Sequence, residues 1–489
     1  MIKFEHSYAK TSNAFYSSIV PTPVAAPTLI ISNPKLAEEL GIPPKYMQAP
    51  LAADHFSGNR LPEGANPIAM AYAGHQFGHF VPQLGDGRAV LLGEVVAKDG
   101  HRYDIQLKGA GQTPYSRSGD GRSSLGPVIR EYLLSEGMMH LGIPTTRALA
   151  AVSTGEPVYR ETPLPGAILT RVARSHIRVG TFQYFAYRGD VDALKQLADY
   201  SIDRLYPELK DADHPYVALL STVMNNQISL IAKWLSIGFI HGVMNTDNTS
   251  ISGETIDYGP CAFMEAYHQN QSFSAIDEQG RYAYANQSRV LYWNITRLAE
   301  ALLPLFDPNE DRAIEMAQAA LDGFWDTFDE AWLNAMAPKF GIATIEEGDK
   351  ALIQEYLELL QATKSDFTLS FRLLAYKLDH TPFPDGLNAV VFASDDYQTW
   401  EPKWHARLAK DPSPTSKKID TMLGVNPLII PRNHLIEEAI QEGLRSGTYT
   451  LMYDLAKAFE TPFQSQAKTT PFMQPATDET AVLQTFCGT

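Results

Sequence analysis

The residues from His241 to Asp257 include oxygen-bearing side chains whose types and spacing suit chemistry on a phosphate. Asp247 and Asn248 are adjacent, and Asp257 follows shortly after them. A carboxylate and an amide oxygen are ligands that a hard divalent cation accepts, and a cation that also bridges polyphosphate oxygens needs few protein ligands. We therefore predict that Asn248 and Asp257 bind a metal ion. Asp247 could accept the proton of an incoming hydroxyl as a catalytic base, or orient a metal-bound water from the outer shell.

The elements around this segment follow a known order. An apolar run with helical spacing precedes it, and two short β-branched runs flank a turn at Ser252-Gly253 within it. Helix, loop, hairpin and Asp-aromatic-Gly is the order of the catalytic half of a protein kinase. A kinase carries its base Asp at the third position of this loop, where Val243 stands here, whereas Asp247 is at the seventh. The pattern predicts a kinase-like loop that keeps both metal ligands but lacks the usual base.

A glycine-rich turn and a lysine come earlier in the chain. Gly85-Asp-Gly87-Arg88 precedes two strand-like runs that are separated by an Asp-Gly turn, and the second run ends at Lys108. Together they resemble the glycine-rich loop and strand lysine that hold phosphates in kinases. The same tetrapeptide recurs at Gly119-Asp120-Gly121-Arg122. The two copies could clamp a di- or triphosphate from two sides, or they could be two ordinary turns.

Further charged residues can be placed by pattern. A predicted helix from Val128 to Leu141 carries Glu131 and Glu136, and only one of them can face Lys108, because five residues along a helix point in different directions. Arg171, in a predicted strand, and Arg174 and Arg178 just after it lie where the two lobes would join, so they could reach phosphates there or be solvated at the surface. His75 and His79 have metal-ligand spacing, but the surrounding glycines argue against a helix and favour hydrogen-bonding roles.

Composition limits the class of protein. The chain has 489 residues, 44% of them hydrophobic, and is long enough for two lobes with separate cores. Its formal charge of −16 argues against nucleic acid or an anionic membrane as a partner. Residues 102–178 hold ten Lys/Arg and six Asp/Glu, so this span is +4 and favours a phosphate-bearing ligand. We expect a cytoplasmic protein, because no signal-like N-terminus or spanning apolar run is found. We also expect a monomer that binds neither nucleic acid nor a membrane.

Several motifs are similar to those of the selenoprotein O family, whose members resemble protein kinases in fold. They run through most of the chain: Phe4-Glu-His-Ser-Tyr8, Gly74-His-Gln-Phe-Gly78, Gln83-Leu-Gly-Asp-Gly-Arg88, Gln106-Leu-Lys-Gly-Ala-Gly111, Thr113-Pro-Tyr-Ser-Arg117, Gly142-Ile-Pro-Thr-Thr-Arg147, Leu169-Thr-Arg-Val172, His176-Ile-Arg178, His241-Gly-Val-Met-Asn-Thr-Asp-Asn248 and Ile256-Asp-Tyr-Gly-Pro260. The resemblance implies an α+β, kinase-like bilobal fold with a β-rich N-terminal lobe, a larger helical C-terminal lobe and a helical extension. The expected divisions are a surface arm (1–60), an N-lobe (61–172), a C-lobe (173–460) and a tail (461–489).

The resemblance also implies protein adenylylation. Such enzymes bind ATP in the reverse sense to a kinase and move AMP onto Ser, Thr or Tyr hydroxyls of proteins, with Mg²⁺ or Mn²⁺ as cofactor and release of pyrophosphate; uridylylation with manganese is a further activity to expect. Position by position, Asp247 is the implied base, Asn248 and Asp257 the metal ligands, and Glu131 the partner of Lys108. The implied nucleotide contacts are Gly85, Gly87, Arg88, Lys108, Asp120, Gly121, Arg171, Arg178 and Asp257.

The two cysteines and two rival functions complete the expectations. Two cysteines are too few for a disulfide framework and fit a reducing compartment. Cys487 stands where some family members carry selenocysteine, so a redox role is open for it, and Cys261 is expected to be a small buried residue. The rival functions are an ordinary kinase that transfers the γ-phosphate and a non-catalytic nucleotide-binding scaffold.

Overall fold

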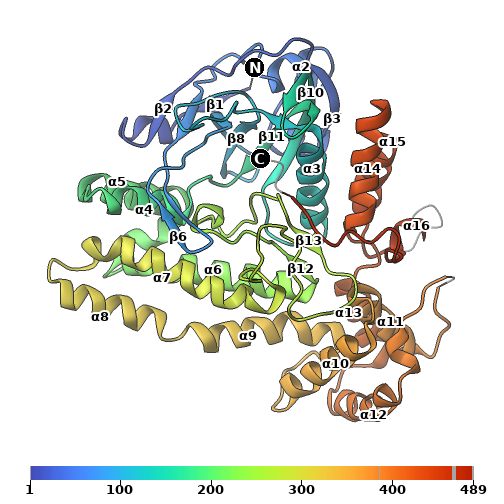
Figure 1. Cartoon of the computed structure of the whole chain (residues 1–489). Coiled ribbons are helices and arrows are strands. Elements are labelled where there is room, and N and C mark those ends of the chain that lie inside the picture. Colours follow the sequence, from blue (N-terminus) through green and yellow to red (C-terminus); the bar gives the residue numbers. More distant parts are fainter. Residues whose placement is uncertain (1, 385, 465–469, 487–489) are drawn as a thin grey trace.

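The computed structural model describes residues 2–384, 386–464 and 470–486. Cys487, which the sequence singles out for a redox role, lies outside the described residues. Residues 4–173 contain a large antiparallel sheet, and the chain after them is mostly helical (Figure 1). The predicted α+β class is confirmed. No helix among the described residues is both long enough and apolar enough to cross a membrane.

The sheet has nine strands. Seven of them follow the order β2 (Tyr16–Ser18), β4 (Ile68–Met70), β7 (Ala89–Val96), β8 (Arg102–Lys108), β11 (Pro163–Ala173), β10 (Arg147–Tyr159) and β3 (Thr28–Ser32). Strand β1 (Phe4–Glu5) pairs with β7, and β9 (Ser123–Ser124) pairs with β11. Residues 1–60, expected as a surface arm, thus contribute three strands to the sheet. Their prolines do not prevent these strands, because β1 and β2 precede the first proline, Pro21, and β3 lies between Pro27 and Pro34.

Strand β8 has apolar side chains on one face and polar or charged side chains on the other. Ile105 and Leu107 belong to a core that includes residues of α1 (Pro34–Glu39) and α2 (Leu51–Phe56). Asp104, Gln106 and Lys108 point to the opposite face, because successive side chains of a strand alternate. All five side chains are buried. The sheet therefore presents charged groups on the face that meets the rest of the molecule.

Helix α3 (Leu125–His140) packs on this second face against β10 and β11. Helices α14 (Asn433–Ser446) and α15 (Thr450–Phe459) pack on α3 from outside, although they come from the far end of the chain (Figure 1). Arg130 of α3 donates to Asn433 Oδ1 at 2.7 Å. The C-terminal helices therefore support the helix that carries Glu131.

The remaining helices form the second half of the structure. Their bounds are α4 (Val179–Tyr187), α5 (Val191–Leu205), α6 (Pro215–Ser236), α7 (Gln287–Phe306), α8 (Glu310–Leu321), α9 (Phe324–Met336), α10 (Asp349–Thr363), α11 (Phe367–Asp379), α12 (Asp395–Lys410), α13 (Thr415–Val425) and α16 (Thr470–Met473). Gly323 separates α8 from α9, and Gly447, which has a φ of +66°, lies between α14 and α15.

The expected hairpin around Ser252-Gly253 does not form. Ser250 makes an isolated bridge with Arg178, and Thr255 makes one with Thr145. The ladder that closes this region is β12 (Phe239–Ile240) with β13 (Ala262–Phe263). The β-branched runs are thus extended, but their partners come from distant segments, which the local pattern could not reveal.

Candidate active site

Lys108 lies at the centre of a buried ion cluster. Its Nζ donates to Glu131 Oε2 at 2.6 Å and to Asp257 Oδ1 at 3.1 Å. Arg171, on the neighbouring strand β11, donates to both of the same carboxylates. Glu131 is therefore the partner of Lys108. The alternative, Glu136, instead holds Arg147 with two hydrogen bonds and accepts from the backbone N of Ala148.

Arg178 links this cluster to the loop that carries Asp247. One guanidinium nitrogen, Nη1, donates to Asp257 Oδ2 at 3.0 Å and to the backbone oxygen of Asp247 at 2.7 Å. The guanidinium also lies 4.6 Å from the centroid of the Tyr72 ring. The side chains of Lys108, Arg171 and Arg178 outnumber the carboxylates of Glu131 and Asp257 by one positive charge. The cluster is therefore suited to attract an anion.

Burial and charge set opposite proton affinities for the two aspartates of the site. Burial alone would raise the pKa of Asp257, but Arg171, Lys108 and Arg178 hold it well below its usual range. Asp247 is 6% exposed, and burial raises its pKa to about 6, although Arg178 and a hydrogen bond from Gln76 act against the shift. Asp257 is thus a fixed anion, whereas Asp247 has the proton affinity of a group that can take up a proton near neutral pH.

Asp247 also has a free oxygen. The atom Oδ1 is buried and has no hydrogen-bond partner among the described residues, while Oδ2 accepts from Gln76 Nε2 at 3.3 Å. Gly74 lies so close that a Cβ at that position would overlap the Asp247 carboxylate. An unpaired buried carboxylate oxygen is costly in a folded protein, so it marks a place where a ligand can supply the missing donor.

The donor set suits a hard cation. Asn248 lies in the single turn η4 (Thr246–Asn248), and its amide nitrogen donates to Val243 O at 2.9 Å, which leaves the amide oxygen as its ligand atom. Asp257 has a φ of +64°, an uncommon conformation for a residue with a side chain, and its carboxylate is ionised. No group of three or more His, Cys, Asp or Glu that could hold a metal ion occurs among the described residues. A cation here would need phosphate oxygens or water in addition to Asn248 and Asp257.

The hairpin of β5 (Gly74–Gln76) and β6 (His79–Val81) is a part of the site that sequence reasoning missed. His75 N donates to Thr246 Oγ1 at 2.7 Å, and Phe77 N donates to Asn245 Oδ1 at 3.1 Å. The hairpin therefore lies directly on the loop that carries Asp247. The expectation that His75 and His79 are not on a helix agrees with this hairpin, and His75 forms a hydrogen bond with Gln183. The positive φ values of Phe77 and Gly78 show the tight turn that the glycines allow.

The two Gly-Asp-Gly-Arg turns pack against other loops of the sheet. A Cβ at Gly85 would overlap the ring of Tyr115, and one at Gly87 would lie 2.8 Å from Tyr115 O. At the second turn, Asp120 pairs with Arg160 at 2.8 Å, and Gly121 lies against Gly111. Arg88 is half-buried, and Arg122 donates to Thr22 O and Pro23 O. The backbone oxygen of Arg88 accepts from Gly109 N at 2.7 Å, next to Lys108. Among the described residues, however, no side-chain hydrogen bond or ion pair joins Gly85, Gly87, Arg88, Asp120 or Gly121 to Lys108, Glu131 or Asp257, so their part in nucleotide binding stays a prediction.

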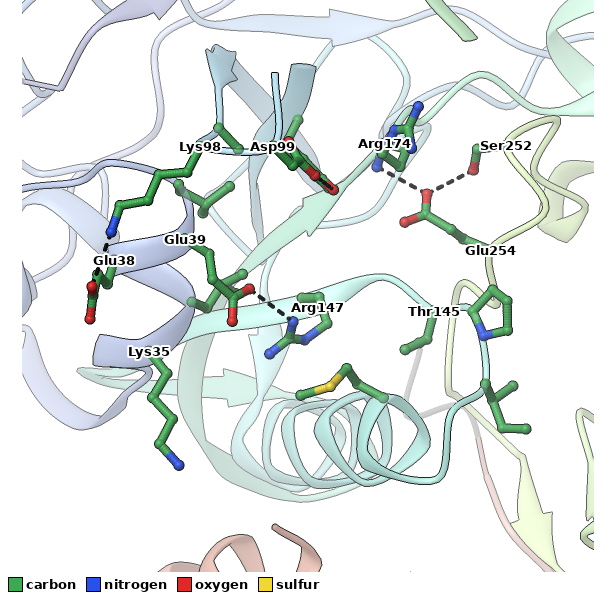
Figure 2. A pocket seen from close by; sticks show the side chains of 17 residues that line it. Lys35, Glu38, Glu39, Lys98, Asp99, Thr145, Arg147, Arg174, Ser252 and Glu254 are labelled. Carbon is green, nitrogen blue, oxygen red and sulfur yellow. Dashed lines mark hydrogen bonds and ion pairs between the residues drawn. The ribbon is translucent and has the colours of Figure 1, made fainter. Parts of the chain in front are cut away.

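Arg174 lies apart from its neighbours in the sequence. Arg171 and Arg178 both bind Asp257, but Arg174 lies over the ring of Tyr103 and lines a cavity of about 890 Å³. Figure 2 shows Arg174 beside Glu254 on one wall of this cavity, with Arg147 and Glu39 across from them. The prediction that three arginines could reach the phosphates is thus supported for Arg171 and Arg178, but not for Arg174. Arg171 lies within β11, whereas Arg174 follows the end of that strand at Ala173, so the strand that positions Arg171 does not fix the direction of Arg174.

Comparison with known proteins identifies the family. A family model described as protein adenylyltransferase SelO matches residues 1–460. The chain belongs to the SelO family. The protein nucleotidyltransferase YdiU of Bradyrhizobium diazoefficiens is 54% identical over 486 residues, which cover 99% of both chains. That of Rhizobium etli is 53% identical over 486 residues (99% of this chain and 97% of the relative), and that of Agrobacterium fabrum is 52% identical over 491 residues (100% of both). As a SelO protein, the chain is an enzyme of the nucleotidyltransferase class.

Proposed function

We propose that this SelO protein transfers AMP from ATP to Ser, Thr or Tyr hydroxyls of other proteins. The family description and the names of the relatives support adenylyl transfer to protein. The observation that carries the proposal within the molecule is Asp247, a buried carboxylate with one unpaired oxygen beside Asn248 and the positive Lys108 cluster. ATP, Mg²⁺ or Mn²⁺ and a protein acceptor are therefore the proposed ligands, and uridylylation with Mn²⁺ is a proposed secondary reaction.

The arrangement also supports a kinase-like fold in which the nucleotide is reversed. A strand lysine paired with a helix glutamate, followed by a catalytic loop and an Asp-Tyr-Gly turn, is the set of parts by which kinases hold ATP. The base of this protein is at the seventh position of the loop, four residues after the place that kinases use. A shifted base fits a shifted reacting phosphorus, so we place the α-phosphate, rather than the γ-phosphate, beside Asp247.

The proposed reaction divides roles among the residues of the site. Asp247 takes the proton of the acceptor hydroxyl, whose oxygen forms a bond to the α-phosphorus. The bond between that phosphorus and the oxygen bridging to the β-phosphate breaks, and pyrophosphate leaves. Asn248 and Asp257 would hold a divalent cation, which when bound supplies positive charge to the phosphates. Lys108, Arg171 and Arg178 keep Asp257 ionised and add positive charge, while Gly85, Gly87, Arg88, Asp120 and Gly121 are proposed to hold other parts of the nucleotide.

Separately labelled ATP tests this function. The purified protein is incubated with acceptor proteins, Mg²⁺ or Mn²⁺, and ATP that carries its label at either the α- or the γ-phosphate. We expect the α-label in protein, with pyrophosphate released in equal amount, and no γ-label. A γ-label in protein would instead favour an ordinary kinase, and the absence of both labels would favour a nucleotide-binding scaffold.

A further inference from the structure

Two arginines and a tryptophan form a positively charged face beside the Asp247 loop. We use the name Arg281 face for Arg281, Trp293 and Arg297 together with His75 and Phe80. The guanidinium carbons of Arg281 and Arg297 each lie 5.0 Å from the Trp293 ring centroid. The His75 ring meets the same tryptophan edge-on at 5.0 Å and lies 4.9 Å from the Phe80 ring. The face thus combines two cations with an aromatic platform, a composition that is enriched at protein interfaces.

The Arg281 face is connected directly to the catalytic loop. Tyr282, the residue after Arg281, donates its hydroxyl to Asn245 Oδ1 at 2.6 Å. The Tyr282 hydroxyl also accepts from the backbone nitrogen of Phe77 at 3.1 Å. Phe77 lies at the tip of the β5–β6 hairpin, in which the backbone nitrogen of His75 donates to Thr246. Asn245 and Thr246 immediately precede Asp247. A protein segment lying on this face would therefore bring its hydroxyl-bearing residue close to Asp247.

Among the described residues, the charge of Arg281 has no carboxylate counterpart, and that of Arg297 has a half-exposed one, Glu300, at 2.6 Å. The Nε atoms of both arginines are buried and have no hydrogen-bond partner in the described part of the chain. Burial lowers the pKa of His75, and Arg297 and Arg281 lower it further, so the positive charge of the face comes from the arginines. Positive charge stands out on a chain with a formal charge of −16.

From these contacts we infer that the Arg281 face docks the acceptor protein and selects acceptors that carry Asp or Glu near the modified hydroxyl. The inference rests on the proposed adenylyl transfer and names its substrate class. A carboxylate would supply the missing partner of Arg281, since guanidinium groups bind carboxylates through paired N–H donors. Trp293 would cover the apolar part of the acceptor segment and exclude water from the ion pair.

Mapping of modified sites tests the inference. A bacterial lysate is treated with the enzyme and α-labelled ATP, and the modified Ser, Thr and Tyr residues are identified by mass spectrometry. For the unaltered enzyme we expect Asp and Glu to be clearly enriched within a few residues of the modified hydroxyls, relative to all hydroxyl residues of the same proteins. The double variant R281E/R297E should lose this enrichment and favour Lys and Arg, because rim charges govern which partners associate. An unchanged site composition in the double variant would overturn the inference.

Peptide kinetics with a matched control separate charge selection from a structural effect. Arg289 is exposed on α7, the helix of Trp293 and Arg297, and lies outside the Arg281 face, so Arg289→Glu makes one Arg-to-Glu charge reversal elsewhere, half the change of the double variant. A peptide that contains a modified site is compared with its Asp-to-Ala version. The acidic peptide should have a KM lower by about tenfold, a ratio that corresponds to one well-placed ion pair. R281E/R297E should abolish the difference while R289E keeps it, and an equal loss in both would contradict the inference. Loss of all α-label in every enzyme would instead refute adenylyl transfer itself.

Discussion

Strand β8 carries two buried ion clusters on one face, and their difference separates structural charge from functional charge. At one end Asp104 accepts from Arg204 at 2.6 Å and from the backbone and ring nitrogens of His176 at 2.9 Å each. At the other end Lys108 meets Glu131 and Asp257. In both clusters every carboxylate oxygen accepts a hydrogen bond, and the partners of Asp104 come from a helix and a loop that it ties to the sheet. The Lys108 cluster has excess positive charge and adjoins the unpaired oxygen of Asp247.

A low carboxyl pKa does not by itself separate a functional ion cluster from a structural one. Both clusters are shielded from water, and in both, basic neighbours hold the pKa of the carboxyl below its usual range against the effect of burial. Low pKa values therefore do not distinguish them. An unpaired atom alone does not distinguish them either, because His176 Nε2 in the Asp104 cluster is also buried without a partner among the described residues. The distinguishing features are the surplus of positive charge and the unpaired carboxylate oxygen of Asp247 beside it, which a bound anion and a reacting hydroxyl would satisfy.

The largest expected effect is the loss of catalysis on Asp247→Asn. Removal of a general base lowers the rate by about 10² to 10⁴, and the amide keeps the shape of the carboxylate. The rate of α-label transfer should fall by this amount, while the affinity for ATP and the melting temperature stay close to those of the unaltered protein. Equal transfer by the variant would reassign Asp247 to a structural role.

The Asp104 cluster should respond in the opposite way. Arg204→Leu leaves the carboxylate of Asp104 buried without its arginine and, among the described residues, with only the two nitrogens of His176 as partners. Breaking a buried pair in this way costs about 3–5 kcal/mol. Chemical denaturation should show this loss of unfolding free energy, whereas transfer by the protein that remains folded should be little changed. A variant that kept its stability but lost transfer would erase the proposed distinction between the clusters.

A smaller change tests the space that Asp247 needs. Gly74→Ala places a Cβ where it would overlap the Asp247 carboxylate, so the carboxylate must shift away from the hydroxyl that it serves. Misplacement of a catalytic group by about 1 Å can cost about 10²-fold in rate. Gly424→Ala in α13 is the matched control, because a Cβ there meets no atom within 4 Å. Transfer by Gly74→Ala should fall and that by Gly424→Ala should not; equal rates would show that Asp247 tolerates displacement.

Glu254 offers the smallest effect, on the pH dependence of stability. Burial raises its pKa from 4.5 to about 7, unlike that of Asp104, which basic neighbours lower. Between these two values the folded protein holds a proton that the unfolded chain has lost, so stability should fall as the pH rises from about 4.5 to 7. Glu254→Gln removes this loss. Its melting temperature, relative to that of the unaltered protein, should therefore rise between pH 5 and pH 8.

The exposed Glu38 provides the control for this measurement. Glu38→Gln makes the same substitution at a side chain that is 78% exposed in its ion pair with Lys98. Its melting temperature relative to the unaltered protein should not vary over the same pH range. If the melting temperature of Glu254→Gln relative to the unaltered protein were also independent of pH, burial would not raise the pKa of Glu254.

The parts of the site that could be predicted from the sequence are those that follow from the periodicity of a single strand or helix. The strand that ends in Lys108 and the helix with Glu131 follow from periodicity, and helical spacing already limited the partner of Lys108 to Glu131 or Glu136. The choice needed the structure, because Arg147 captures Glu136. The contact of Gln76 with Asp247 joins residues 171 positions apart, and no spacing rule reports such a pair.

The loop after Asn248 illustrates the other limit of sequence reasoning. Its β-branched residues are extended, as their type favours, but Arg178 and Thr145 supply the bridges that a hairpin would have made internally. Arg174 shows the same limit, since its distance in sequence from Arg171 and Arg178 is short and its surroundings are different. Tertiary partners, rather than propensity, decided both cases.

The position of the nucleotide relative to Asp247 is the most direct test of the proposed chemistry. A crystal structure of the protein with a non-hydrolysable ATP analogue and Mg²⁺ would show which phosphate lies beside the unpaired Oδ1 atom. We predict the α-phosphate there, with the cation held by Asn248 and Asp257. A γ-phosphate beside Asp247, with the adenosine deep in the cleft as in an ordinary kinase, would contradict adenylyl transfer by this site.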